Sequence, residues 1–319
     1  MNNQNLQPKI VFMGTPEFAA YCLEHLHRVY PIHTVVTIED KPIGRGLKIS
    51  ESSVKKKANE LGITSILQPK SLKDDEFVHQ IESIQPDIIV VIAFKILPKK
   101  VYSLSKLGSF NIHGSLLPKY RGAAPIQWAI IRGETTTGVT SFLLTDVVDT
   151  GNIIGQRSFA IESDWTAGDL HDAMMSYAAE LSIETCKQLI DGNVTPISQN
   201  DEEASSAPKL FRENTQIDWN QTTVEISNFV RGLSPYPVAW TEFEGEIMKV
   251  HSISFCTKDV ALAPNEYNMT DTQFFVGCSD GVISIEKLQL PNKSKMKTSE
   301  FLRGFRGKRN GTFPLFQKK

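Results

Sequence analysis

The sequence predicts an α/β protein: a doubly wound, mostly parallel Rossmann-like sheet with a second, smaller OB-like β-barrel domain. Three observations lead to this prediction. Short apolar runs alternate with amphipathic segments in the first half of the chain, which is the pattern of repeated βαβ units. The run 87–93 is apolar on consecutive residues, as expected of a strand covered on both faces. The length of 319 residues is enough for two domains.

The elements of the first domain follow from these patterns in chain order. Residues 9–14 form the first strand, and Pro16 marks the first turn of the next helix, where proline is favoured. The remaining expected strands are 33–38, 87–93, 109–113, 138–144 and 152–161, and the expected helices are 16–29, 54–61, 74–84, 124–132 and 167–190. Strands that alternate with helices in this way favour crossover connections within one parallel sheet.

Residues 191–208 separate the two expected domains. The segment is polar, contains two prolines and follows neither the helix period nor the strand period, so we expect a linker. The domain limits are therefore 1–190 and 209–319. The second domain is expected to contain a helix at 224–233 and strands at 239–243, 247–253, 273–278 and 282–290. Such short strands suit a small barrel, a type often used on nucleic acids.

Composition excludes several classes of protein. With 40% hydrophobic and 22% charged residues, the chain can build a core and is not disordered. The start is polar, and its first apolar run is too short for a signal peptide or a membrane span, so we expect a soluble, cytoplasmic protein with no membrane partner. The four cysteines include no CxxC pair, which disfavours a zinc ribbon or a redox motif and predicts buried free thiols.

The net charge of −2 hides an asymmetry along the chain. Residues 287–319 carry ten Lys and Arg against the single acid Glu300, a balance of +9 that leaves −11 for the preceding 286 residues. A second basic cluster occupies residues 41–57. Such runs are most often solvated surface, but two of them on an acidic body favour a polyanionic partner.

Polar residues that could carry chemistry follow two of the predicted strands. Asn111 and His113 are two residues apart in one strand, so their side chains point to the same face. Asp149 follows the strand 138–144. An amide donor, a histidine and an aspartate at neighbouring strand ends can hold an oxyanion and move a proton. A structural histidine and a turn-forming asparagine are the plainer alternative.

Two cofactor classes are disfavoured by spacing. The first βα turn, residues 13–18, contains a single glycine where a dinucleotide site needs GxGxxG, so a nicotinamide cofactor is not expected. His25 and His27 lie on different faces of a predicted helix, which disfavours a metal site. We therefore expect no metal.

Longer motifs connect these candidates to a known family. They are FMGTPEFA near the start, DKPIGRGLK at 40–48, NIHGSLLPKYRGAAPIQWAI from Asn111, DTGNII from Asp149, APKL at 207–210, IDW at 217–219, VRGLSPYPVAW from Val230 and LQLPNKSKM near the end. On these motifs the chain resembles, nearly end to end, the 10-formyltetrahydrofolate-dependent formyltransferase family. Within that family it is similar to the enzymes that formylate methionyl initiator tRNA, giving formylmethionyl-tRNA for translation initiation.

The resemblance implies a role for each matching position. It assigns Asn111, His113 and Asp149 to catalysis, with 10-formyltetrahydrofolate as the formyl donor and no metal. The family's SLLP segment, here Ser115, Leu116, Leu117 and Pro118, would lie on the folate side of the cleft. The positions expected to bind the initiator tRNA are Arg45, Lys48, Lys293, Lys295, Lys297 and Arg306. Residues 1–190 would then be the catalytic domain and 209–319 the tRNA-binding domain.

The chain departs from the family pattern in three places. Residues 93–95 read Ala-Phe-Lys where the family commonly has Ala-Tyr-Gly, within the expected pterin pocket. Residues 143–146 lack the usual methionine and acid pattern, and Asn292 replaces a glycine. None of these departures touches the three catalytic positions.

Two alternatives stay open at the level of the sequence. A formyltransferase could act on another amine, such as an amino-sugar nucleotide or glycinamide ribonucleotide, and a noncatalytic RNA-binding protein could use the same scaffold. A glycinamide enzyme needs no basic second domain, and a sugar enzyme should lack the loop around Arg45. A pure RNA-binding protein gains little from three polar residues at strand ends.

Overall fold

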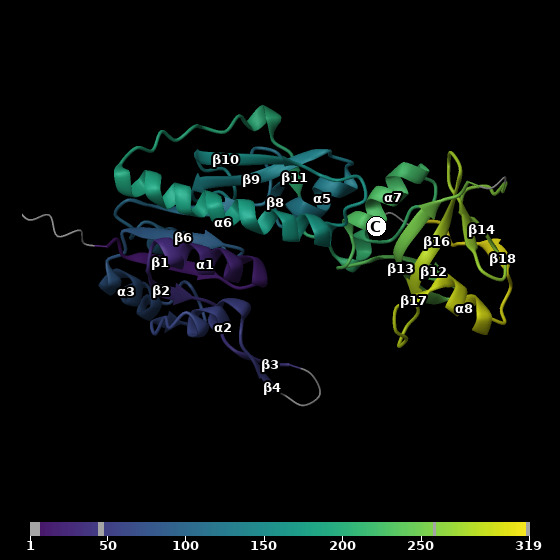
Figure 1. Cartoon of the computed structure of the whole chain (residues 1–319), viewed down its shortest axis with the longest axis horizontal. Helices are drawn as coiled ribbons and strands as arrows, with labels where there is room; N and C mark the ends of the chain where they lie inside the picture. The colour runs from purple at the N-terminus through teal and green to yellow at the C-terminus, as the bar shows by residue number, and fades with distance from the viewer. Residues whose placement is uncertain (1–6, 44–47, 258–259, 317–319) are drawn as a thin grey trace, which may run out of the picture. The chain divides into compact units, whose positions relative to one another are not determined.

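The first part of the chain is built on a seven-stranded sheet in the order β10-β9-β7-β6-β1-β2-β5 (Figure 1). The computed structural model describes residues 7–43, 48–257 and 260–316. The elements around this sheet are β1 (Ile10–Gly14), α1 (Glu17–Val29), β2 (Ile32–Val36), β3 (Lys41–Ile43), β4 (Lys48–Ser50), α2 (Ser53–Glu60), β5 (Ile66–Leu67), α3 (Asp75–Ile84), β6 (Ile88–Ile92), α4 (Lys99–Tyr102), β7 (Gly108–His113), β8 (Arg121–Gly122), β9 (Thr136–Leu143), β10 (Ile153–Ala160) and α6 (Ala167–Asp191).

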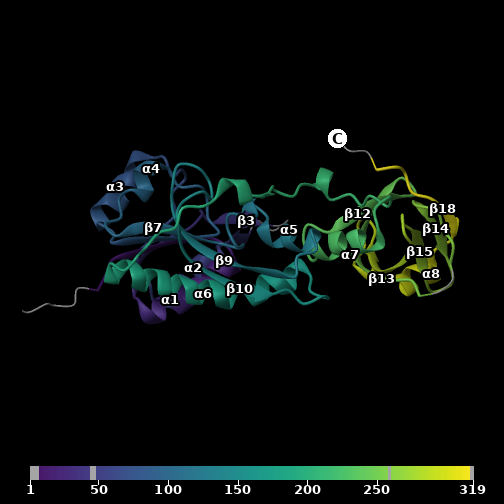
Figure 2. The same ribbon diagram turned by 90° about the horizontal axis from the view of Figure 1, so that it is seen from above.

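Most of the sheet is parallel, as predicted. β1 pairs in parallel with β2 and β6, β6 pairs with β7, and β2 pairs with β5. All five residues of β6 are buried, which explains its uninterrupted apolar sequence. Figure 2 shows α3 and α4 on one side of the sheet and α1 and α6 on the other. The predicted doubly wound, Rossmann-like architecture is therefore confirmed.

β9 reverses the direction of the sheet. It pairs antiparallel with β7, which places Phe142 opposite Asn111 and Thr140 opposite His113. β9 consequently ends beside the start of β7, where the N–H of Leu144 donates to the carbonyl of Ser109 at 2.9 Å. The loop 144–152 therefore begins near the end of β7 that is opposite His113.

Most of the expected linker, residues 191–206, is part of the first compact unit. The linker contains the short helix η1 (Asp201–Glu203) and β11 (Ser206–Ala207), and β11 pairs with β8. Ile197 forms an isolated bridge with Ile153, and the N–H of Arg121 donates to the carbonyl of Ser205 at 2.8 Å. The segment is thus attached to the sheet by backbone hydrogen bonds.

The second unit is an antiparallel half-barrel in the order β12-β13-β16-β15-β14-β18, with β17 beside β16. Its elements are α5 (Pro125–Ile131), η2 (Arg212–Asn214), α7 (Thr223–Gly232), β12 (Ala239–Phe243), β13 (Glu246–Phe255), β14 (Glu266–Met269), β15 (Phe274–Gly277), β16 (Val282–Gln289), β17 (Met296–Lys297), α8 (Thr298–Gly304) and β18 (Asn310–Thr312). The predicted β-rich second domain is confirmed, whereas β14, β17, β18 and α8 were not predicted from the sequence.

Aromatic rings fill the core of the half-barrel. The ring of Phe243 lies between 5.6 and 6.3 Å, centroid to centroid, from those of Tyr267, Phe274, Phe301 and Phe313. All four pairs are edge-on, an arrangement that aromatic quadrupoles favour. This packing brings strand and helix residues that are far apart in sequence into one core.

The two units interleave along the chain. The second unit includes Ala123–Thr135 and Ala160–Leu170 in addition to Ala207–Lys319. Within it, α5 packs against α7, and Gly232 allows the close approach because a Cβ there would lie 2.6 Å from Cγ1 of Ile131. The chain therefore passes between the two compact units more than once along its sequence.

The half-barrel should tolerate alanine at one glycine but not at another. A Cβ on Gly277 would lie 2.1 Å from the carbonyl oxygen of Ala263, whereas Gly304 has no neighbour within 4 Å. We expect Gly277→Ala to lower the free energy of unfolding by about 3 kcal/mol through overpacking. Gly304→Ala, in the last turn of α8, should change it by no more than about 1 kcal/mol. Denaturant titration of both variants checks this, and equal stabilities would contradict it.

Candidate active site at the end of β7

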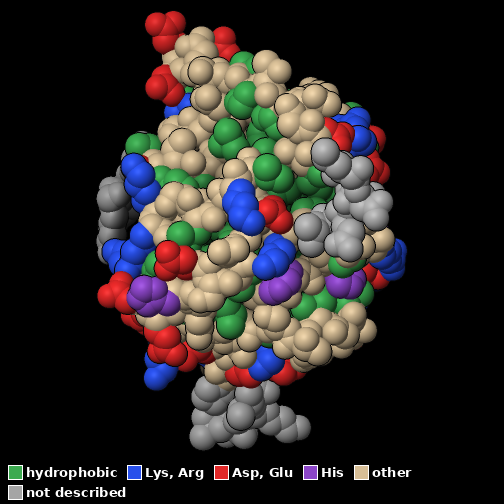
Figure 3. All heavy atoms as spheres, turned by 90° about the vertical axis from the view of Figure 1, so that its left-hand side faces the viewer, with side chains coloured by type: hydrophobic (Ala, Val, Ile, Leu, Met, Phe, Trp, Pro, Cys, Tyr) green, Lys and Arg blue, Asp and Glu red, His purple; other side chains and the backbone are tan. Residues whose placement is uncertain are grey.

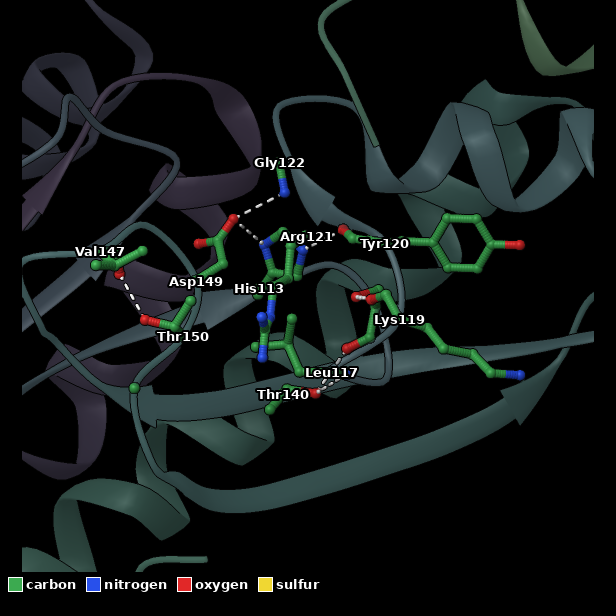
Figure 4. A network of polar contacts seen from close by, with 12 residues as sticks. His113, Leu117, Lys119, Tyr120, Arg121, Gly122, Thr140, Val147, Asp149 and Thr150 are labelled. Carbon is green, nitrogen blue, oxygen red and sulfur yellow. Dashed lines mark hydrogen bonds and ion pairs between the residues drawn. The ribbon is translucent and has the colours of Figure 1, made fainter. Parts of the chain in front are cut away.

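His113 is the last residue of β7, and both of its ring nitrogens face polar atoms. The side chain is buried, with 6% exposure. Nε2 lies 2.8 Å from the carbonyl oxygen of Tyr120, and because a carbonyl only accepts, Nε2 carries the hydrogen. Nδ1 lies 3.8 Å from Oδ2 of Asp149, within ion-pair range but beyond a direct hydrogen bond (Figure 4). Nδ1 is therefore the nitrogen that can exchange a proton with a substrate.

Asp149 reaches His113 from the loop between β9 and β10, not from a parallel strand end. Its carboxylate Oδ2 accepts a hydrogen bond of 2.9 Å from the N–H of Gly122, and its exposure is 8%. Its backbone carbonyl accepts from Nε2 of Gln199 at 2.9 Å. These contacts fix both the side chain and the backbone of Asp149. Gly122 lies within the motif that begins at Asn111, whereas Gln199 lies in no motif and its role could not be predicted from the sequence.

Left-handed backbone conformations gather beside the end of β7. The φ angles are 58° at Asp149, 61° at Tyr120 and 47° at Ala93, which follows the neighbouring strand β6. Such conformations cost non-glycine residues about 1–3 kcal/mol each and concentrate at functional sites. Two of the three residues contact His113 directly. The strain therefore coincides with the polar residues that the sequence singles out.

Asn111 presents a donor that its surroundings leave free. It lies two residues before His113 in β7 and is half-buried. Within the described part of the chain, its side-chain amide makes no hydrogen bond. The amide N–H groups are therefore available to an oxygen of a bound substrate.

The four residues of the SLLP segment divide into two kinds. Ser115 and Leu117 are buried, with exposures of 0% and 3%, and Ser115 Oγ donates to the carbonyl of Lys119 at 2.6 Å. The N–H of Leu117 donates to Oγ1 of Thr140 at 3.0 Å. Leu116 and Pro118 are half-buried. Ser115 and Leu117 thus hold the loop in shape, and Leu116 and Pro118 offer its accessible surface.

Apolar side chains are exposed on two loops of this region. Ile96 is 75% exposed, and Val147 and Val148 are 64% and 47% exposed. Asp146, in the loop of Val147 and Val148, contacts the helix α4 that follows Ile96: it accepts a hydrogen bond of 2.7 Å from the hydroxyl of Tyr102 and lies 3.6 Å from Nζ of Lys99. The hydrogen bond to Asp146 raises the pKa of Tyr102. Apolar surface next to a few polar groups is typical of a site for a flat organic ligand.

The expected tRNA-binding positions are spread over both units. Arg45 lies outside the described residues, and Lys48 begins β4, where its backbone pairs with Ile43. Arg306 follows α8, and its guanidinium donates to the carbonyls of Arg303 and Phe305, each at 3.3 Å.

Lys293, Lys295 and Lys297 belong to a lysine face on β13, β16, β17 and the connection between β16 and β17. The lysine face consists of Lys249, Lys287, Lys293, Lys295 and Lys297, all of them exposed. In the described ranges none of these lysines pairs with a carboxylate. Burial lowers the pKa of the neighbouring His251 imidazole, and the charges of Lys295, Lys249 and Lys287 lower it further. The side of the first unit shown in Figure 3 instead intersperses acidic and basic side chains.

The described residues also bear on metal binding, on cysteine reactivity and on membrane-spanning helices. In residues 7–43, 48–257 and 260–316 no group of three or more His, Cys, Asp or Glu is arranged to hold a metal ion. Among the described residues no cysteine forms a disulfide, and burial raises the pKa of Cys22 and Cys186 and raises that of Cys278 to about 12. Those three thiols stay protonated and are poor nucleophiles. No helix in these ranges is long and apolar enough to cross a membrane.

Two family models match the chain. The formyl transferase family matches residues 8–185, and the formyl transferase C-terminal domain family matches residues 209–306. The first match contains Asn111, His113 and Asp149, and the second contains the lysine face.

Solved structures share the fold of this chain. The N-formyltransferase from Helicobacter canadensis, solved with folinic acid and dTDP-3-aminofucose, has a TM-score of 0.65 at 22% identity, over 87% of this chain and 98% of that one. HypX from Aquifex aeolicus in complex with tetrahydrofolic acid has a TM-score of 0.65 at 19% identity, and this chain spans 52% of its length. At such identities the likeness shows the fold alone.

Curated relatives match nearly the whole chain at higher identity. The methionyl-tRNA formyltransferase of Bacteroides fragilis is 42% identical over 309 residues, covering 93% of this chain and 95% of that protein. The enzyme of the same name from Clostridioides difficile is 43% identical over 302 residues, covering 93% and 96%. With a formyl transferase model over more than half of its length and relatives of this identity, the chain belongs to the methionyl-tRNA formyltransferase family.

Proposed function

We propose that this protein transfers the formyl group of 10-formyltetrahydrofolate to the free amino group of methionyl initiator tRNA in the cytoplasm. The observation that carries the proposal is the 42% identity, over 93% of the chain, to a protein named for that reaction. The free amide of Asn111 and the pair of His113 and Asp149 supply groups that the reaction needs. The product is formylmethionyl-tRNA for translation initiation.

The reaction creates two charges that the site has to stabilise. The lone pair of the amine forms a bond to the formyl carbon, and the bond from that carbon to the folate nitrogen breaks. On the way, negative charge develops on the formyl oxygen and positive charge on the attacking nitrogen. One proton leaves the amine, and one reaches the folate nitrogen. Catalysis therefore needs a donor for the oxygen and a path for the proton.

The geometry suggests a division of these tasks. Asn111, whose amide is unpaired, donates to the developing oxyanion. His113 keeps Nε2 on the carbonyl of Tyr120, so Nδ1, which faces Asp149 at 3.8 Å, accepts and returns the proton. The carboxylate of Asp149 stabilises the imidazolium that forms and holds the ring orientation. Both residues are buried, which strengthens this electrostatic interaction.

The folate would lie against the loops that expose apolar surface. The flat pterin ring suits the exposed side chains of Ile96, Val147 and Val148, with Leu116 and Pro118 at the SLLP segment. Ser115 and Leu117 would act through the shape of the loop. Residues 93–95 directly follow β6, so the Phe94-Lys95 departure would alter the lining of the proposed folate pocket.

The tRNA would contact the basic surfaces of both parts of the chain. Lys287 lies directly opposite Lys297 in the pairing of β16 with β17, an arrangement that costs stability unless an anion neutralises it. A phosphate backbone bound to the lysine face meets that need. We propose the same role for Arg45 and Lys48 near the acceptor end and for Arg306. Residues 1–190 would carry the chemistry, and residues 209–319 would bind the tRNA.

A direct assay separates this function from its alternatives. Purified protein is incubated with 10-formyltetrahydrofolate and methionyl initiator tRNA, with an amino-sugar nucleotide as a competing acceptor. We expect formylmethionyl-tRNA as the product. Formylation of the sugar alone would establish the alternative acceptor, and tRNA binding without any formyl transfer would establish the noncatalytic RNA-binding protein.

Loss of the proposed donor or proton carrier should slow turnover without unfolding the protein. We expect Asn111→Ala and His113→Ala each to lower kcat by roughly 10²-fold or more, the scale of one lost oxyanion-hole donor. The melting temperature should stay close to that of the parent. The exposed His79, replaced by alanine, is the matched control and should leave kcat unchanged. A variant at Asn111 or His113 with parental turnover and normal melting would remove that residue from catalysis.

Neutralising the lysine face should weaken tRNA binding in a salt-dependent way. We expect Lys249→Gln, Lys295→Gln and Lys297→Gln together to raise KM for the tRNA and to leave KM for the folate unchanged. Each tRNA phosphate that the protein no longer neutralises should reduce the slope of log affinity against log salt by roughly 0.7 to 0.9. Kinetics at several salt concentrations measure this slope.

The control for this experiment removes the same charge elsewhere. Lys73→Gln, Lys100→Gln and Lys106→Gln change exposed lysines of the first unit, two of which pair with Asp75 and Asp87. We expect this triple variant to keep the parental slope. An equal effect of both triple variants would mean that net charge, and not the lysine face, determines tRNA affinity.

A further inference from the structure

Gln199 joins the segment after α6 to the loop that carries Asp149. Its side-chain Nε2 donates to two backbone carbonyls, those of Asp149 at 2.9 Å and Gly151 at 2.8 Å. Its Oε1 accepts from Nε and Nη2 of Arg121 at 3.0 and 2.8 Å. We propose that Gln199 is a positioning residue for formyl transfer, which holds the backbone of Asp149 so that its carboxylate faces His113. This inference rests on the proposed catalytic role of Asp149.

The hydrogen bonds of Gln199 determine which atom of its amide is which. A guanidinium only donates and a backbone carbonyl only accepts, so Oε1 must face Arg121 and Nε2 must face the loop. The amide then uses both of its N–H groups and both lone pairs of its oxygen. A glutamate at this position could still accept from Arg121 but could not donate to the carbonyls. The contact therefore depends on an amide.

The loop that carries Asp149 also passes close to the end of β9. A Cβ on Gly151 would lie 1.6 Å from the carbonyl oxygen of Leu143, so the chain passes tightly against the end of β9. Between these points Asp149 has a φ of 58°, which a non-glycine residue adopts only at a cost in free energy. Gln199 binds the carbonyls on either side of Thr150 and so supports this turn.

Arg121 and Gly122 connect Gln199 to the carboxylate of Asp149. The N–H of Gly122 donates to the Asp149 carboxylate at 2.9 Å, and the side chain of the preceding Arg121 fixes Gln199. Asp201 accepts a further bond of 2.8 Å from Arg121 but is 83% exposed. The backbone and the carboxylate of Asp149 are thus both held, directly or through Gln199, by the same dipeptide.

This support matters for the proton transfer at His113. Nδ1 of His113 and Oδ2 of Asp149 are 3.8 Å apart, so a small movement of the turn changes their interaction substantially. A displacement of about 1 Å at a catalytic group can cost on the order of 10²-fold in rate. Binding of either substrate need not change, because within the described ranges the hydrogen bonds of the Gln199 side chain go to Arg121 and to the loop carbonyls.

The test compares variants that keep or remove the two N–H donors. We expect Gln199→Met and Gln199→Glu each to lower kcat by about 10- to 100-fold, with KM for folate and for tRNA within about threefold of the parent. Asp201→Ala is the matched control, because it removes a partner of Arg121 without touching the loop, and should keep parental kcat. A purely structural Gln199 would lower the melting temperature and leave kcat unchanged, which would overturn the proposal.

A double-mutant cycle shows whether Gln199 acts through Asp149. In an Asp149→Ala background, Gln199→Met should cost no further activity, because the group that it positions is already gone. Additive losses would overturn the proposal. If Gln199→Met does not fold, Arg121→Met leaves the glutamine in place without its anchor, and it should lower kcat in the same direction but less.

The cycle also separates this inference from the function beneath it. If Asp149→Ala itself turns over at the parental rate, the proposed catalytic role of Asp149 fails. If Asp149→Ala is inactive while Gln199→Met and Gln199→Glu are fully active, only the positioning role fails.

Discussion

The antiparallel pairing of β9 with β7 is the constraint on which the candidate site depends. In a purely parallel sheet, the residues after each strand gather at one edge, and an aspartate after β9 would lie beside the end of β7 without further help. Here β9 ends near the start of β7, so the following loop has to return before Asp149 can face His113. The left-handed turn at Asp149 and the glycine at position 151 are consequences of that return.

The same return explains why distant segments take part in the site. A loop that leaves the sheet has no ladder of hydrogen bonds to hold it, so its polar backbone groups need partners elsewhere. Gly122 supplies an N–H to the carboxylate, and Gln199 supplies two N–H groups to the backbone. Residues of the connecting segments therefore help to fix the geometry of the buried His113 and Asp149 pair. Side chains that must be held in a precise geometry usually depend on hydrogen bonds from a surrounding layer of residues.

The sequence predicts those elements and site residues that depend on hydrophobic periodicity and on local chemistry. β6 is a continuous apolar run and α1 is an amphipathic segment after a proline, and both lie where they were expected. β17 has only two residues, and all three residues of β18 are exposed, so neither strand shows the alternation of apolar and polar residues that predicts a strand. The direction of β9 is set by pairing with β7, which no local pattern specifies. Asn111 and His113 were identifiable from their alternation in one strand, whereas the contacts of Gln199 exist only in the folded protein.

The interleaving of the two units has a consequence for how such a chain can be rearranged. Ala123–Thr135 and Ala160–Leu170 belong to the same unit as Ala207–Lys319. The chain therefore passes from one unit to the other at several points, of which residue 207 is one. Ile131 of α5 packs on the half-barrel core, so an excised C-terminal fragment would expose apolar surface that the N-terminal part normally covers. Gene fusion at a single junction would break this unit. Grafting the half-barrel onto another catalytic sheet would require three matched exchanges along the sequence.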